Sequence, residues 1–71
     1  MARAALLYAA KHGRDAGLGV NAVAWSALRR HLCKAFGCGD AEATACVASM
    51  PEAALDVAGD VVRIAMNHYG A

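Results

Sequence analysis

The sequence predicts an all-α fold, a compact bundle of about four short helices. Apolar residues make up 59% of the 71 residues, above the ~45–50% typical of globular domains, and much of the excess is alanine, the strongest helix former. The segments between the glycines and Pro51 have helical periodicity, and none shows the sustained alternation of a strand. The length predicts one small helical domain, residues 1–71.

The first two helices are predicted over residues 3–12 and 21–36. Asn21 is the expected N-cap of the second, because its side-chain oxygen can accept a hydrogen bond from a free backbone N–H of the first turn. Gly37 is the expected stop, since glycine readily adopts the left-handed conformation that ends many helices. Together with the later helices, this helix predicts a core of Trp25, Leu28, Leu32, Phe36, Leu55, Ala58, Val61, Val62 and Ala65.

A short third helix is predicted over residues 41–48, with Asp40 as its N-cap. A fourth is predicted to begin at Ser49 or Pro51 and to end near His68. Its polar residues form one narrow strip, and its apolar residues cover the rest of its circumference. A surface helix needs an apolar stripe only somewhat wider than about 100°. The fourth helix is therefore either central to the bundle or in contact with a second chain.

The charges are sorted between the two halves of the chain. Residues 1–34 contain six basic residues and one acidic residue, a net charge of +5, whereas residues 35–71 contain one basic and five acidic residues, a net charge of −4. Such a chain can offer a basic face and an acidic face to different partners.

Residues for catalysis or cofactor binding are sparse. The chain has two serines, its three histidines fall on three different predicted helices, and the glycine-rich segment 13–19 lacks the Lys-Ser/Thr pair of a phosphate loop. We therefore expect no enzymatic activity, no cofactor and no small-molecule substrate.

Cys33, Cys38 and Cys46, with His31 or His12, form the one arrangement that resembles a zinc site. Only Cys33 and Cys38 approach the usual ligand spacing, so small buried side chains are the favoured interpretation. Three cysteines cannot all pair within one chain, and the N-terminus lacks the pattern of a secretory signal. We expect a cytoplasmic protein with reduced thiols and, without an apolar stretch of ~18 residues, no membrane segment.

The basic cluster of Arg29, Arg30, His31 and Lys34 raises the alternative of a helix–turn–helix DNA-binding regulator. The helices predicted over 21–36 and 41–48 have the required dimensions. The second of them, however, carries no Arg, Lys, Asn or Gln to reach base edges. A nucleic acid is therefore the less favoured partner.

The favoured hypothesis is a non-enzymatic protein–protein interaction module. We expect a stoichiometric regulator, inhibitor or adaptor of a larger assembly, of the kind carried by phages and mobile elements, that also forms a homodimer. A small metal-binding or thiol-redox protein is the second alternative. The expected partner contacts are apolar residues of the fourth helix (Val57, Ile64, Met66 and Tyr69) and charged residues (Arg29, Arg30, Lys34, Asp56 and Asp60).

Overall fold

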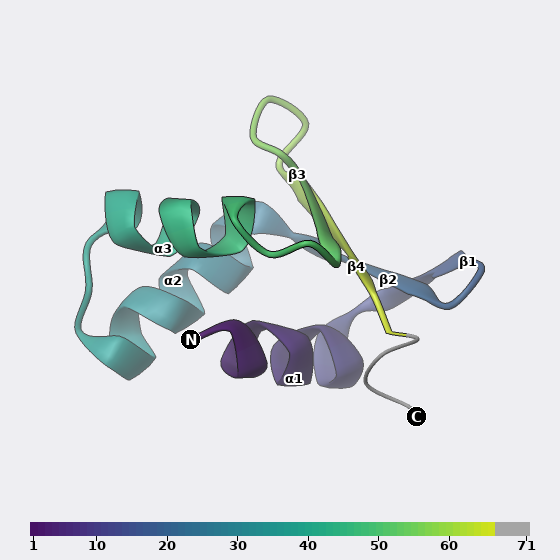
Figure 1. Cartoon of the computed structure of the whole chain (residues 1–71), viewed down its shortest axis with the longest axis horizontal. Coiled ribbons are helices and arrows are strands. Elements are labelled where there is room, and N and C mark those ends of the chain that lie inside the picture. Colours follow the sequence, from purple (N-terminus) through teal and green to yellow (C-terminus); the bar gives the residue numbers. More distant parts are fainter. Residues whose placement is uncertain (67–71) are drawn as a thin grey trace.

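The protein has an α+β fold, which corrects the predicted all-α bundle. A computed structural model describes residues 1–66, in which three helices pack beside a four-stranded antiparallel sheet. The elements are α1 (Ala2–His12), β1 (Arg14–Gly17), β2 (Val20–Ala24), α2 (Trp25–Phe36), α3 (Asp40–Ala48), β3 (Ala53–Asp56) and β4 (Val61–Ala65) (Figure 1).

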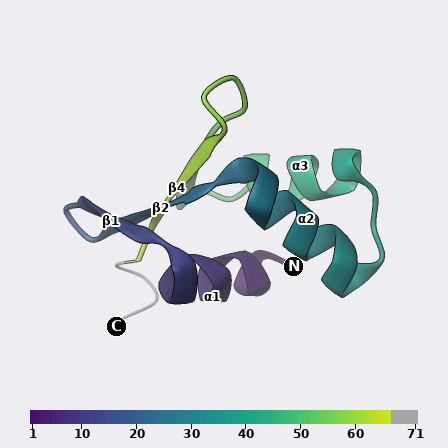
Figure 2. The ribbon, with the colours of Figure 1, turned by 180° about the vertical axis from the view of Figure 1, so that it is seen from behind.

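The strands lie in the order β1-β2-β4-β3. The central strand β4 pairs with β2, where Val62 lies opposite Val23, and with β3, where Val62 lies opposite Leu55. Two views of the molecule place α2 between α1 and α3, while the β1–β2 hairpin extends away from the helices (Figures 1 and 2). The sheet thus gives the small helical layer a second surface to pack on.

The predicted fourth helix does not form, and a β-hairpin takes its place. Residues 53–56 and 61–65 are strands, joined by a turn in which Asp60 has a φ of +52°. In β4 the alternate residues Val62 and Ile64 are fully buried, whereas Arg63 is exposed. β-Branched residues favour strands because their stiff side chains fit a pleated surface. Leu55, Val62 and Ile64, which the prediction placed on a helix, therefore lie in the sheet.

The start of the second predicted helix is also wrong. Residues Val20–Ala24 form β2, and α2 begins at Trp25. Asn21 caps no helix start. Its side-chain N–H donates to the carbonyl oxygen of Ala9 over 3.1 Å, which ties β2 to the last turns of α1.

The other helix boundaries lie within one residue of the prediction. The first helix begins at Ala2, one residue before the prediction, and ends at His12 as expected. Gly37 ends α2 with a φ of +64°, a conformation that glycine adopts at little cost. The third helix begins at Asp40, which is its first residue rather than its cap.

The core lies between the helices and one face of the sheet. The predicted core residues Trp25, Leu28, Leu32 and Val62 are buried, as expected. Phe36 was also predicted to be buried but is 48% exposed, and Ala58 is exposed in the turn after β3. The largest fully buried side chains are Trp25, Leu28, Leu32, Val47, Val62 and Ile64.

The topology contains a helix–turn–helix followed by a hairpin. The helices α2 and α3 are joined by residues 37–39, and the β3–β4 hairpin follows and pairs with the strand that precedes α2. The strand β1 adds an outer strand beside β2. This element order describes the fold alone, since one fold serves many functions.

Candidate functional site

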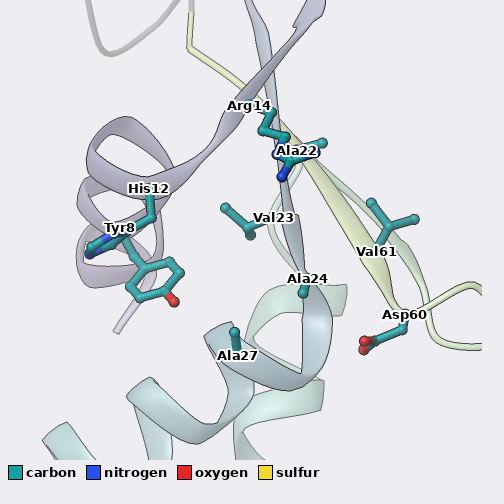
Figure 3. A pocket seen from close by; sticks show the side chains of 9 residues that line it. All are labelled: Tyr8, His12, Arg14, Ala22, Val23, Ala24, Ala27, Asp60 and Val61. Atoms are coloured by element: carbon teal, nitrogen blue, oxygen red, sulfur yellow. The ribbon is translucent and has the colours of Figure 1, made fainter.

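An open cavity of about 410 Å³ lies where α1, the sheet and α2 meet. Tyr8 and His12 stand on one side of it, the β2 residues on the other, and Asp60 lies at the end near the start of α2 (Figure 3). Much of the floor is built from small side chains. The lining residues are Tyr8, His12, Arg14, Ala22, Val23, Ala24, Ala27, Asp60 and Val61.

A second open hollow of about 240 Å³ adjoins the first between α1 and α2. Ala4, Leu7, Tyr8, Lys11 and His31 line it. Tyr8 is the one described residue that belongs to both linings. We refer to the two hollows together as the α1–α2 groove.

Three aromatic rings cluster in the α1–α2 groove. The Tyr8 ring centroid lies 4.6 Å from that of His12 and 4.8 Å from that of His31, with ring planes tilted by 44° and 35°. Tyr8 and His12 share a helix face because they are four residues apart, whereas His31 comes from α2. The contact between α1 and α2 therefore brings the phenol ring of Tyr8 and the imidazole rings of His12 and His31 together at the α1–α2 groove.

Two basic side chains, Lys11 and Arg14, and one acidic side chain, Asp60, line the α1–α2 groove. Within residues 1–66 the single ion pair joins Arg29 Nε to Asp40 Oδ1 over 3.7 Å, so Lys11 and Arg14 have no carboxylate partner. The one acidic side chain in the lining, Asp60, accepts hydrogen bonds from the backbone N–H and the hydroxyl of Ser26.

The predicted charged contact residues are distributed over several parts of the fold. Arg30 and Lys34 are exposed on α2, whereas Arg29 pairs with Asp40. The carboxylate of Asp56 accepts the backbone N–H of Gly59 over 2.9 Å, within the β3–β4 turn. The two predicted contact aspartates, Asp56 and Asp60, thus shape that turn and hold it to α2.

The predicted apolar contact residues do not share a surface in the described part of the chain. Val57 is 60% exposed in the β3–β4 turn, Ile64 is fully buried, and Met66 is half-buried against the core. Tyr69 lies outside the described residues. Because the fourth helix does not exist, these residues have no common helix face.

The helix α3 occupies the second position of the helix–turn–helix. Its exposed side chains include Ala41, Glu42, Ala45 and Ala48, with Asp40 at its start. None of these residues can donate a hydrogen bond from its side chain to a base edge, and the two carboxylates repel phosphate. The exposed side chains of α3 therefore do not favour recognition of bases in the major groove of DNA.

The three cysteines are free thiols. Cys33 Sγ donates to Asp40 Oδ1 over 3.4 Å. Desolvation, this hydrogen bond and the neighbouring Cys38 raise the pKa of the Cys33 thiol to about 11. Within residues 1–66 no group of three His, Cys, Asp or Glu side chains is placed to hold a metal ion.

Leu18 is the most exposed large apolar residue of the described chain, at 98%, and it sits at the tip of the β1–β2 hairpin. Its φ is +54°, and the next residue, Gly19, has a φ of +72°. Positive φ is uncommon for non-glycine residues and is an outlier for a bulky side chain.

Neither Leu18 nor the aromatic cluster of Tyr8, His12 and His31 was predicted from the sequence as a candidate functional site. The Gly-Leu-Gly order at 17–19 is a local signal, since it places an apolar residue where the chain turns. The spacing of Tyr8 and His12 predicts their contact, but no local pattern could bring His31 to the same place.

None of the helices in the described residues is long and apolar enough to cross a membrane. No protein-family model, no curated protein and no solved structure matches the chain.

Proposed function

We propose that this protein is a non-enzymatic interaction module that docks on a larger protein through the tip of its β1–β2 hairpin. The observation that carries this proposal is Leu18, a large apolar side chain that is 98% exposed in a left-handed backbone conformation. Both features of Leu18 cost free energy in the isolated protein.

The first cost is conformational. Residues 18 and 19 both have positive φ, as in the two-residue type I′ turn, whose preferred residues are asparagine, aspartate and glycine. A left-handed conformation costs roughly 1–2 kcal/mol for an ordinary L-residue. Backbone strain of this kind tends to gather at functional sites, where it forms part of how the site works.

The second cost is the exposure of the side chain to water. Burying a leucine side chain in a partner would contribute about 1.5–3 kcal/mol. Two hydrogen bonds hold β2 and the turn in place: Met66 N–H donates to Gly19 O over 2.7 Å, and the side-chain N–H of Asn21 donates to Ala9 O. An anchored tip loses little conformational entropy on binding, which favours affinity.

The exposed cations Arg30 and Lys34 on α2 supply a second element of the proposed interaction. Charges at the edge of an interface steer the encounter and set the orientation of the partner. We also propose a cytoplasmic location, which the three free thiols support.

The test compares Leu18→Asn with Val57→Asn, a matched change of an exposed apolar residue in the other turn. Asparagine suits the positive φ, so Leu18→Asn keeps the hairpin and removes only the apolar contact. Tagged wild-type and variant proteins are incubated with lysate of the native host, and bound proteins are quantified by mass spectrometry.

We expect a stoichiometric partner that Leu18→Asn loses at least tenfold, about 1.4 kcal/mol, and that Val57→Asn retains. Light scattering on the purified proteins reports whether that partner is a second copy, in which case Leu18→Asn converts a dimer to a monomer. Equal capture by the wild type and Leu18→Asn, with an unchanged mass in solution, would refute the proposed docking tip.

A further inference from the structure

We propose that the α1–α2 groove binds single-stranded nucleic acid, with bases against the Tyr8–His12–His31 cluster and phosphates at Lys11 and Arg14. This binding site is separate from the docking tip at Leu18 and has a different chemistry. It also differs from duplex recognition by a helix–turn–helix, because α3 takes no part in it.

The shape of the larger hollow suits a flat ring. Figure 3 shows Tyr8 and His12 on one side and the short side chains Ala22 and Ala24 of β2 on the other, with Ala27 below. A volume of about 410 Å³ falls in the range of small-ligand sites, ~300–1,000 Å³. Alanines leave the space open, and the Tyr8 ring, which points toward Ala27 in Figure 3, offers a surface on which a base can stack.

The aromatic side is suited to bases of any identity. His12 and His31 are exposed, and each contacts Tyr8 through its ring. Stacking on aromatic side chains is tolerant of sequence because every base has a π-face. Acidic peptides carry negative charge but mostly lack such a face, so the rings favour a nucleic acid over a peptide.

Two basic side chains of the groove, Lys11 and Arg14, are placed to contact more than one phosphate of a strand. Lys11 lines the smaller hollow and Arg14 lines the larger one, and Tyr8 lines both. Neither cation has an ion-pair partner within the described residues. One cation in each of two adjoining hollows matches successive phosphates along a strand better than the phosphate of one free nucleotide.

The basic residues of the chain are concentrated in the elements that carry the groove cations. The net charge of +5 in residues 1–34 belongs to α1, β1 and α2, the elements on which the groove cations and His31 lie, whereas acidic residues prevail in α3 and the β3–β4 hairpin. A local excess of positive charge attracts polyanions and raises their rate of encounter. Both hollows open to solvent, so a strand can enter and leave without being threaded.

The experiment measures fluorescence anisotropy of a labelled oligothymidylate of about 12 nucleotides, within the range of known single-strand site sizes. The test variant is Lys11→Gln with Arg14→Gln. The matched control is Arg3→Gln with Arg63→Gln, which removes the same charge from exposed residues outside the groove lining. Each protein is titrated between about 50 and 200 mM salt. Thymidine monophosphate and an oligoglutamate serve as competitors.

We expect binding at low salt that weakens at least tenfold in the groove variant and less than about threefold in the control. Losing two phosphate contacts should also reduce the slope of log K against log salt by about 1.4, at ~0.7 per contact for a single strand. Tyr8→Leu, which keeps an apolar side chain, should weaken binding about tenfold or more through lost stacking, while circular dichroism shows an unchanged fold. Leu18→Asn should bind as the wild type does.

Four results would overturn the inference. The first is no binding of the oligonucleotide at the lowest salt. The second is equal loss in the groove variant and its control, which would show a non-specific charge effect. The third is displacement by oligoglutamate as readily as by unlabelled oligonucleotide, and the fourth is displacement by the mononucleotide at equal nucleotide concentration.

Discussion

Asp60 caps helix α2 from a distance of 34 residues along the chain. Its carboxylate accepts the backbone N–H of Ser26 over 2.7 Å and the Ser26 hydroxyl over 2.9 Å. Its backbone carbonyl also accepts the N–H of Trp25 over 3.1 Å. The residue at the N-cap position, Ala24, offers no side-chain acceptor. The β3–β4 turn therefore supplies the cap that the helix lacks and fixes the hairpin to the helical layer.

Removing the Asp60 carboxylate should destabilise the whole domain. We expect Asp60→Ala to lower the free energy of unfolding by about 1–2 kcal/mol, as at other helix caps, measured by urea denaturation. Ser26→Ala removes only the hydroxyl bond and keeps the backbone N–H bond, so its loss should be smaller. Equal or inverted losses for the two variants would show that the cap is not the source of the stability.

Relieving the backbone conformation at Leu18 should stabilise the isolated protein. We expect Leu18→Asn to raise the free energy of unfolding by about 0.5–1 kcal/mol, because asparagine tolerates the left-handed region. Leu18→Val should lower it, since a β-branched residue is poorly suited to positive φ. If thermal unfolding gives the opposite order, Leu18 is not under strain.

The buried position of Ile64 predicts a core role. Because its side chain is fully buried in β4, Ile64→Ala should cost about 2–5 kcal/mol, a large share of the stability that a core of this size can supply. Val57→Ala, at an exposed turn position, should change stability by no more than about 0.5 kcal/mol. Chemical denaturation of both variants checks this contrast, and a small effect of Ile64→Ala would contradict the packing of β4.

The Cys33 thiol should be unreactive near neutral pH. Desolvation and the Asp40 carboxylate raise its pKa to about 11, so its alkylation rate should keep rising up to that pH, because the thiolate is the nucleophile. Rates at each cysteine can be followed by mass spectrometry of digested samples. Asp40→Ala should shift the Cys33 profile to lower pH, and an unchanged profile would remove Asp40 as a cause.

The same raised pKa links folding to alkaline pH. The folded protein holds the Cys33 proton more tightly than the unfolded chain does, so the contribution of this thiol to stability is fully present below the ordinary pKa of about 8.5. That contribution is lost as the pH rises to about 11. Cys33→Ser should reduce this part of the alkaline destabilisation in denaturation measurements between those values.

Local residue patterns by themselves determined the first helix, the end of α2 and the third helix. The end of α2 at Gly37 follows from the backbone freedom of one residue, and the first helix from an alanine-rich run. The sorting of charge between the two halves was also visible in the sequence. These features need no partner elsewhere in the chain.

Only the tertiary structure decided whether residues 53–65 are a helix or two strands, and which residues meet in the groove. Val62 and Ile64 are compatible with either element until β2 and β3 pair on both sides of β4. His31 reaches Tyr8, and Asp60 reaches Ser26, through folding alone. The physical reason is that strand pairing and contacts between separate elements are non-local, so their free energy is absent from any short stretch of sequence.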